Sequence, residues 1–501
     1  MKHTSLYRCI AAMLAILMLL SCAALVSCAE DVTDDPQDTQ DPTQDPSDVE
    51  EEEKEEPRVM PDVPDGMYDY TVKVMHWDFA GGYDFIWEEV CPDEDISSYT
   101  GDLIADKNFD RTAWLEENYG IVIEKGYQEH VAMPTAVSNM IASGSDDYQM
   151  QIEFGFGAQR AFGKNYYLDL STLDYIDFEK PWWVDSVVNE LRIGDYVEFA
   201  LSDMLLLDKA STSLMFYNIR MATDLGITGL YEDVENKEWT FERLAEYAEM
   251  ALTDDGDGEW TQTDIYGIIG GDDPTHNFYI GTGKHFLTKD ANGEYYYEYG
   301  SDEDTIEIMT VILEDLLYQD FYWNTWAHRN EDTSLLGFDT GSSLFLASVA
   351  RDCNSLRQME DAYGILPNPL YDEYQDQYYS QINNYRDSIL SVFSTAGDPN
   401  KVAAAIELMS YYSYYEIYPS FYEVVIQGRG TRDAESREML DIIFSNRTYD
   451  LTFVFDPFGL SDEILRFPAN KNSNLASFLA ARESKMESAL EQLLELRDQY
   501  N

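Results

Sequence analysis

The sequence is poor in cysteine, histidine and basic residues. It has 5 cysteines, 6 histidines and 32 Lys and Arg against 96 Asp and Glu, which gives a net charge of −64 over 501 residues. Nucleic-acid binding requires Lys and Arg to neutralise phosphates, so this balance excludes nucleic acid as a partner. It also argues against a surface that lies flat on anionic lipid. The acidic excess predicts solubility but does not identify a ligand.

Several enzyme motifs are also missing. The sequence has no Gly-Xaa-Ser-Xaa-Gly elbow, no His-Glu-Xaa-Xaa-His helix and no phosphate loop. His3 lies in the N-terminal segment, and the other histidines show no metal-ligand spacing. No pair of carboxylates stands out as a glycosidase dyad, whose separation cannot be deduced from sequence. We therefore expect a binding protein without catalytic residues; a surface enzyme acting on polysaccharide is the alternative.

The N-terminal apolar run is too short to span a membrane comfortably. It extends from Ile10 to Leu20, after the positive charges of Lys2 and Arg8, whereas a span needs roughly 20 apolar residues. A charged start, a short apolar core and a small-residue exit are typical of a secretory signal. Residues 1–27 are therefore predicted to be a signal peptide that is removed.

Cys28 ends that signal. The segment Leu25-Val26-Ser27-Cys28 resembles the lipobox of bacterial lipoproteins. The resemblance implies a diacylglycerol on the thiol and often a further acyl group, such as palmitate, on the new amino group. Several acyl chains give stable anchoring. A second candidate ends at Cys22 but lies inside the apolar run, and an ordinary secreted protein with an incidental cysteine is the alternative.

The segment from Ala29 to Gly66 has no aromatic residue. It holds sixteen acids, six prolines and only two bases, Lys54 and Arg58. Such a segment buries too little apolar surface to fold and repels itself. Residues 28–66 are therefore predicted to be the lipidated cysteine and a disordered acidic stalk. An acidic tail that binds a partner is the alternative.

The remaining body, 67–501, is too long for one typical core and predicts two lobes. Strands alternate with helices in its first half, which indicates the α/β class. Its two cysteines, Cys91 and Cys353, could pair, but two thiols do not make a disulfide scaffold. The predicted strands are 70–75, 121–124, 149–154, 197–201 and 213–217. The predicted helices are 110–119, 134–143, a helix from Thr240, 306–317, 401–412, 436–444 and 476–500.

Several ordered segments resemble a known family. They include Arg111…Leu115-Glu116-Glu117…Gly120-Ile121, Ser143-Gly144-Ser145-Asp146-Asp147-Tyr148, Leu168-Asp169-Leu170, Phe178-Glu179-Lys180-Pro181-Trp182-Trp183, Phe216-Tyr217-Asn218, Glu238-Trp239-Thr240-Phe241, Asp264-Ile265-Tyr266-Gly267-Ile268 and Tyr363-Gly364-Ile365-Leu366-Pro367. In this order and spacing, from about Tyr70 to Asp441, the chain resembles extracellular solute-binding proteins of ABC importers, of the family 1 sugar type.

The resemblance implies a two-lobed fold of the periplasmic-binding-protein type II class, with hinge crossings and a helical C-terminal part. By analogy, lobe 1 comprises 67–204 and 335–388, and lobe 2 comprises 205–334 and 389–501. The crossings are expected near 201–211, 330–341 and 385–394. Closure of the lobes about a hinge traps ligand in such folds.

The resemblance also implies a carbohydrate or oligosaccharide ligand, delivery to ABC permease subunits and a monomeric receptor. Aromatic plates and convergent polar groups suit a sugar site. The candidate ligand-binding residues are Trp77, Phe154, Phe156, Asp208, Ser211, Asn277, Phe278, Trp323, Trp326, Arg351 and Tyr385. A lipid-anchored receptor on the extracellular face of the cell membrane fits a Gram-positive-type envelope. A helical-repeat glycan-capture lipoprotein without a transport role is a further alternative, which predicts mostly helix in the first 200 body residues.

The segment from Thr253 to Asp264 resembles an EF-hand-type loop. Ca²⁺ prefers six to eight oxygen ligands and a Gly at the sharp turn, where Gly258 stands. The candidate metal ligands are Asp255, Asp257, Glu259, Thr261 and Asp264. Thr253 replaces the first Asp and Asp264 the usual bidentate Glu, so an acidic turn without metal is the alternative. No cofactor is otherwise expected.

Overall fold

A computed structural model describes residues 57–78, 89–92, 102–330, 336–426, 434–471 and 474–500. The predicted signal, Cys28 and most of the predicted stalk lie outside these residues. The chain divides into two units, Met1–Arg58 and Val59–Asn501, and all elements below belong to the second. That unit begins before the expected Met67, because the Lys180 ammonium pairs with Asp62 at 3.1 Å and Val63 is buried.

The first sheet has the strand order β12-β3-β1-β2. Its strands are β1 (Tyr70–Asp78), β2 (Ile121–Glu129), β3 (Met150–Glu153) and β12 (Ile389–Val392). β1 runs parallel to both β2 and β3, and β12 runs antiparallel to β3. Helix α2 (Leu103–Tyr119) leads into β2 through Gly120, whose φ of 63° favours glycine and ends the helix.

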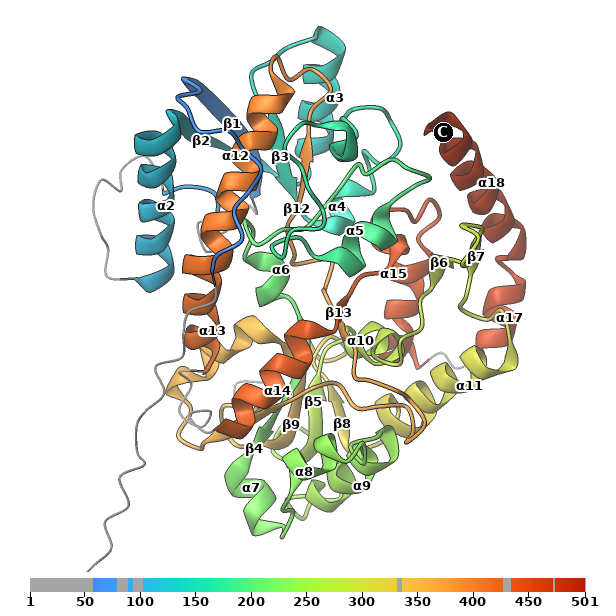
Figure 1. Ribbon diagram of the computed structural model, residues 1–501. Helices are drawn as coiled ribbons and strands as arrows, with labels where there is room; N and C mark the ends of the chain where they lie inside the picture. The colour runs from blue at the N-terminus through green and yellow to red at the C-terminus, as the bar shows by residue number, and fades with distance from the viewer. Residues whose placement is uncertain are drawn as a thin grey trace, which may run out of the picture. The chain divides into compact units, whose positions relative to one another are not determined.

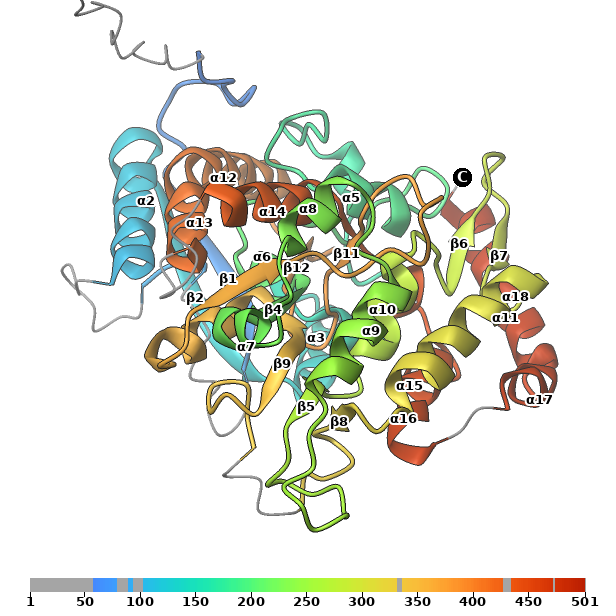
Figure 2. The same ribbon diagram turned by 90° about the horizontal axis from the view of Figure 1, so that it is seen from below.

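The second sheet has the order β10-β4-β9-β5-β8. Its strands are β4 (Ser213–Asn218), β5 (Tyr266–Gly270), β8 (Tyr322–Asn324), β9 (Ser343–Val349) and β10 (Tyr363–Leu366). β5 runs parallel to β8 and β9, whereas β4 runs antiparallel to β9 and β10. Figure 2 shows β4, β9 and β5 side by side, with α9 (Phe241–Ala251) and α10 (Pro274–Gly281) beside them. Two short pairs, β6 (Leu287–Lys289) with β7 (Tyr295–Tyr297) and β11 (Ser380–Gln381) with β13 (Arg447–Thr448), complete the strands.

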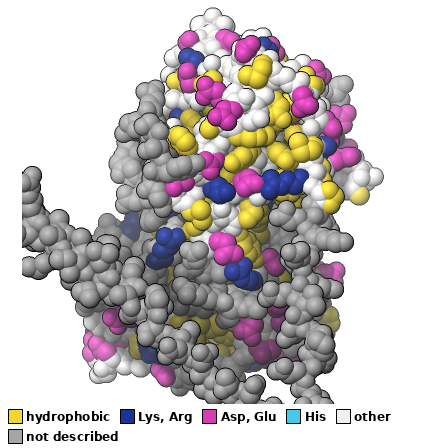
Figure 3. Space-filling model, turned by 60° about the vertical axis from the view of Figure 1, so that its left-hand side comes forward, with side chains coloured by type: hydrophobic (Ala, Val, Ile, Leu, Met, Phe, Trp, Pro, Cys, Tyr) yellow, Lys and Arg dark blue, Asp and Glu magenta, His cyan; other side chains and the backbone are white. Residues whose placement is uncertain are grey.

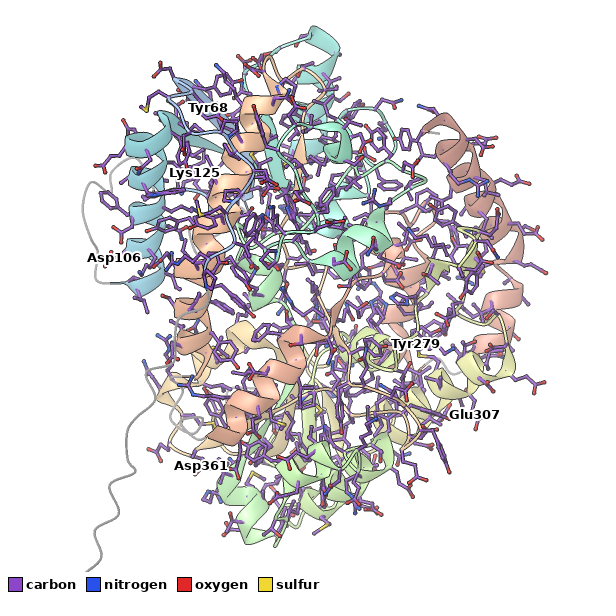
Figure 4. All side chains as sticks on the ribbon, viewed as in Figure 1. Tyr68, Asp106, Lys125, Tyr279, Glu307 and Asp361 are labelled. Atoms are coloured by element: carbon purple, nitrogen blue, oxygen red, sulfur yellow. The ribbon has the colours of Figure 1, made fainter. Side chains whose placement is uncertain are left out.

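Helices occupy most of the remaining chain, and those after β12 form the expected helical C-terminal part (Figure 1). The other α-helices are α3 (Met133–Ser143), α4 (Gly155–Ala158), α5 (Asp185–Leu191), α6 (Leu207–Ala210), α7 (Ile219–Asp224), α8 (Leu230–Glu235), α11 (Glu303–Val311), α12 (Pro399–Tyr412), α13 (Tyr418–Ile426), α14 (Ala434–Ser445), α15 (Leu460–Leu465), α16 (Phe467–Asn470), α17 (Leu475–Ala480) and α18 (Glu483–Tyr500). Short 3-10 or π-helical turns cover Leu170–Thr172, Ile312–Leu317, Ala350–Gln358, Ser413–Ile417 and Leu451–Phe453. Tyr279 of α10 lies in the interior, whereas Glu307 of α11 is at the periphery (Figure 4).

The assignment of 335–388 to the first lobe is wrong. β9 and β10 lie in this range, and both belong to the second sheet. β8 and β9 share that sheet too, so the chain does not cross between sheets at 330–341. The predicted domain bounds placed β12 in lobe 2. The strand instead pairs with β3 of the first sheet in an antiparallel ladder. The chain passes between the sheets from β3 to β4, from β10 to β12, and again after β12, since α14 contacts β10.

Two local predictions also differ. Residues 197–201 make only a single bridge, Ala200 with Leu390 of β12, because the chain at Tyr167 and Leu168 pairs with the end of β12 and the residue after it. Trp77 lies beyond the predicted strand 70–75, but the structure places it within β1, where it is buried. The other predicted strands are present, and the predicted final helix is divided into α17 and α18.

Acidic groups do not cover the surface evenly. On the face seen in Figure 3, Lys and Arg side chains lie beside a hydrophobic area, with Asp and Glu around them. In the parts of the chain that the structure describes, no helix has both the length and the apolar character that a membrane crossing requires.

Candidate functional site

A cavity of about 290 Å³ is lined by residues that follow strands of both sheets and by residues of later segments. It is lined by His130, Phe154, Phe156, Arg160, Asp272, Asp273, Trp326, Tyr385, Arg386, Leu465 and Arg466. Four of them, Phe154, Phe156, Trp326 and Tyr385, belong to the eleven ligand-binding candidates of the sequence. The cavity is therefore the candidate functional site.

Strand direction explains where this cavity forms. The parallel strands β2 and β3 end at Glu129 and Glu153, and His130 and Phe154 follow them directly. The parallel strands β5 and β8 end at Gly270 and Asn324, just before the lining residues on the second sheet. In open α/β sheets, ligands bind outside the carboxyl ends of the strands. Both sheets thus present such ends to one cavity.

Aromatic rings form much of the wall. The rings of Phe156 and Tyr385 are stacked, with centroids 4.8 Å apart and planes 29° apart. Phe154 lies 6.3 Å from Phe156, and the buried ring of Trp77 lies 5.2 Å behind Phe154. Trp326 is 45% exposed, and the Arg329 guanidinium lies over its ring, 5.3 Å from the centroid. These rings offer apolar plates of the kind that pack against the C–H faces of sugars.

The segment carrying Phe156 is held against the crossing segment that carries Tyr385. Gly155 N–H donates to Asp387 Oδ1 at 2.8 Å, and Phe156 N–H donates to the Asn384 carbonyl at 3.0 Å. Tyr449 Oη donates to Asp387 Oδ2 at 2.7 Å, and burial raises the pKa of Asp387 to about 7. A Cβ on Gly155 would stand 1.9 Å from Tyr449 Oη, so this close approach requires glycine.

Two carboxylates enter the site from the second sheet. Asp272 is buried and accepts a hydrogen bond from Asn324 Nδ2 at 2.8 Å. Burial raises the pKa of Asp272, and the bond from Asn324 opposes that shift. Asp273 is half-buried at the N-cap of α10, where its side chain caps no backbone N–H. Both can accept hydrogen bonds from ligand hydroxyls.

Three guanidinium groups share the cavity lining with these acids. Arg466 pairs with Asp462 at 3.0 Å, and Asp462 also accepts a bond from Tyr385 Oη at 3.1 Å. Within the described part of the chain, no acceptor takes a hydrogen bond from the side chain of Arg160 or Arg386. The site therefore offers both donors and acceptors beside its aromatic wall.

Several candidates lie in the core instead. Asn277 and Phe278 are on α10 and are 1% and 0% exposed. Trp323 is also buried, and its ring stacks on His328 with centroids 3.9 Å apart. Arg351 has its Nε 3.7 Å from the carboxylate of Asp352. None of the four lines the cavity, because burial or a local partner directs the side chain elsewhere.

Asp208 and Ser211 lie at the first passage between the sheets but not in the cavity. Asp208 is fully buried and accepts a bond from Arg447 Nη1 at 2.7 Å, and Lys209 Nζ lies 3.3 Å from it. Ser211 donates to the Leu207 carbonyl at 2.6 Å. Both residues stabilise the connection rather than face a ligand.

Seven lining residues were not predicted. They are His130, Arg160, Asp272, Asp273, Arg386, Leu465 and Arg466. His130 directly follows β2 and Asp272 comes two residues after β5, so the rule that ligands bind at the carboxyl ends of strands could have found them. Leu465 and Arg466 lie far along the chain on and after α15, where no sequence signal indicated the cavity.

In the acidic loop from Thr253 to Asp264, the carboxylates that cluster are not the set predicted as metal ligands. Asp254, Asp255 and Asp257 bring oxygens within 4.8 Å of one another. Asp264 is instead turned toward the loop backbone, accepting N–H bonds from Asp255 at 2.8 Å and Thr261 at 2.6 Å. These bonds give Asp264 a role in closing the loop that needs no ion. Cys91 and Cys353 are buried and do not form the disulfide considered above.

Among the comparisons with known proteins, those with solved structures found matches. No protein-family model matches the chain, and no curated protein matches it either. The structure is similar to that of a sugar transporter from Rhizobium etli in an open conformation, with a TM-score of 0.54 and 15% identity, over 86% of this chain and 99% of the other. The chain has the fold of solute-binding proteins. This confirms the predicted two-lobed α/β class.

Two further similar structures are sugar-binding proteins by name. One is the cyclic α-maltosyl-1,6-maltose binding protein from Arthrobacter globiformis, with a TM-score of 0.55, 12% identity, and coverage of 84% of this chain and 99% of that one. The other is the galacto-N-biose/lacto-N-biose I-binding protein of the ABC transporter from Bifidobacterium longum, with a TM-score of 0.52, 13% identity, and coverage of 85% and 98%. These neighbours are binding proteins rather than enzymes. The strands β1 to β4 contradict the helical-repeat alternative.

Proposed function

We propose that this protein is an extracellular receptor that captures a carbohydrate in the cavity between its two sheets and delivers it to an ABC permease. The observation that carries the proposal is the composition of that cavity. It combines the stacked rings of Phe156 and Tyr385, the exposed indole of Trp326, and carboxylate and guanidinium groups from separate parts of the chain. An apolar wall with a few convergent polar groups is the usual form of a small-molecule site.

A saccharide panel tests ligand capture. A ligand that binds only the folded state, at a hundred times its Kd, stabilises that state by about 2.7 kcal/mol. At least one saccharide should therefore raise the melting temperature of the protein. If saccharides leave stability unchanged while an amino acid or peptide raises it, the carbohydrate proposal is wrong.

We propose further that the receptor is held on the outer face of the cell membrane by lipid on Cys28. The lipobox-like segment and the acidic stretch after it support this part. Tethering would raise the effective concentration of receptor at its permease without adding contacts. Labelled palmitate should enter the wild-type protein and a Cys22→Ser variant but not Cys28→Ser. Equal labelling of both variants would refute the assignment.

A further inference from the structure

The cavity differs in charge from the chain that contains it. The whole sequence has three acidic residues for each basic one, 96 against 32. The cavity lining instead has three basic residues, Arg160, Arg386 and Arg466, and two acidic ones, Asp272 and Asp273. A chain so short of basic residues places three of its 32 at the one site proposed to bind ligand.

Two of these guanidinium groups are uncommitted. Arg466 is paired with Asp462 through Nη2 at 3.0 Å and Nε at 3.3 Å. Arg160 is exposed and Arg386 is half-buried, and among the described residues neither side chain has an ion-pair or hydrogen-bond partner within the protein. Arg160 interacts electrostatically with the buried Glu153 but donates no hydrogen bond to it, so both guanidiniums can still donate to a bound molecule.

The two arginines also stand next to the aromatic wall in the chain. Arg386 follows Tyr385, whose ring stacks on Phe156 with centroids 4.8 Å apart. Arg160 lies in the turn after α4, and α4 is the short helix that contains Phe156. A sugar ring packed on these aromatic faces would have both guanidiniums in the same cavity.

We infer that the ligand is an acidic saccharide whose anionic group is bound by Arg160 and Arg386; this inference rests on the proposed carbohydrate-binding function. A guanidinium matches a carboxylate with two parallel N–H···O bonds, which makes a uronate carboxylate the best fit. A sulfate ester offers the same anionic oxygens. Asp272 and Asp273, on the second sheet, would accept bonds from hydroxyls on the rest of the molecule.

Matched saccharide pairs test the inference by calorimetric titration. The probes are oligogalacturonate, oligomannuronate and oligoglucuronate, each beside the same oligosaccharide with its carboxyl groups reduced to alcohols, together with neutral and sulfated oligosaccharides. At least one uronate should bind ten times or more tighter than its reduced partner, and its affinity should fall as salt is added. Selective binding of a sulfated member instead would assign the anionic group to sulfate.

Single-residue variants test whether Arg160 and Arg386 cause the preference for acidic saccharides. Arg160→Gln and Arg386→Gln should each weaken binding of the acidic saccharide about tenfold and change binding of its reduced partner less than twofold. Arg386→Lys should restore part of the loss, since it keeps the charge. Arg437→Gln is the control, because Arg437 is exposed and pairs with Glu423 at 2.9 Å outside the cavity.

The outcomes separate the inference from the function on which it rests. If neutral or reduced saccharides bind as tightly as acidic ones, the inference is overturned while the receptor proposal stands. Unchanged selectivity in both Gln variants would also overturn it. If no saccharide binds, the receptor proposal fails and the inference fails with it.

Discussion

At the scale of single residues, Trp326 gives the clearest test of the cavity. Its side chain is 45% exposed, so its removal should leave folding intact. Trp326→Ala should weaken saccharide binding about tenfold or more, because aromatic anchors contribute much of the binding energy of such sites. Trp260→Ala is the matched control, since Trp260 is 40% exposed and lies outside the cavity. Titration calorimetry that finds equal losses in both variants would remove Trp326 from the site.

Glu89 gives a second test at this scale, of stability rather than binding. Its buried carboxylate accepts N–H bonds from Leu206 at 2.8 Å and Leu207 at 3.0 Å, and a bond from Ser388 Oγ at 2.5 Å. It thereby joins two of the three passages between the sheets, from β3 to β4 and from β10 to β12. Glu89→Gln brings an amide donor into this set of donors and should lower the free energy of unfolding by about 2–4 kcal/mol.

Urea denaturation measures this loss. Glu246→Gln is its control, because Glu246 is exposed and forms only a surface pair with Arg243 at 2.9 Å. Such surface pairs contribute about 0–1 kcal/mol. A Glu89→Gln variant as stable as this control would show that the carboxylate does not hold the two passages together.

At the scale of elements, the contact between α4 and the crossing segment should control the site. Gly155→Ala would place a Cβ 1.9 Å from Tyr449 Oη. Overpacking of this kind costs about 1–3 kcal/mol of stability, and the displaced Phe156 should weaken saccharide binding. Tyr449→Phe removes the clashing oxygen, so the double variant should recover part of both losses. If the double variant is no more stable and binds saccharide no more tightly than Gly155→Ala, the clash with Tyr449 Oη is not the cause of the losses.

The sequence predicted elements better than their assignment to lobes. Alternation at 70–75 and the glycine after Tyr119 indicated β1 and the end of α2, because strand and helix-end signals are local. Pairing between distant strands is not local. The placement of β9 beside β4 and β5, and of β12 beside β3, could not be deduced from spacing, and the analogy used instead put both in the wrong lobe.

The same distinction between local signals and long-range packing explains which site residues could be predicted. Phe154 and Phe156 follow a strand end, and the cavity includes them. Trp323 instead lies within β8, and its buried ring packs on His328. Arg466 reaches the cavity through a helix far along the chain, which only the tertiary structure reveals.

At the scale of the whole molecule, buried carboxyl groups predict how stability changes with pH. Burial raises the pKa of Glu153 and Glu198 to about 8, and that of Glu190, Asp387 and Glu407 to about 7. In the unfolded chain these groups titrate near the ordinary values of about 4. Between about pH 4 and 8 the folded state therefore binds more protons, so the free energy of unfolding falls as pH rises. The melting temperature should be several degrees higher at pH 5.5 than at pH 8.

One variant isolates a single group within this trend. Glu198 Oε2 accepts the Gly163 N–H at 2.9 Å, a bond that a Gln oxygen can also accept. Glu198→Gln should be more stable than wild type at pH 8 by about 1–2 kcal/mol and should show a weaker pH dependence. Glu249→Gln, at an exposed position, should show neither change. Higher stability at pH 8 than at pH 5.5 in the wild type would contradict the whole argument.

The central claim is that a saccharide binds in the cavity between the two sheets. A crystal structure of the protein with the tightest-binding member of the saccharide panel tests it most directly. The account predicts a sugar ring against Phe156, Tyr385 or Trp326, with hydroxyls bonded to Asp272 or Asp273. A saccharide bound at another place on the molecule, with this cavity holding only water, would contradict it.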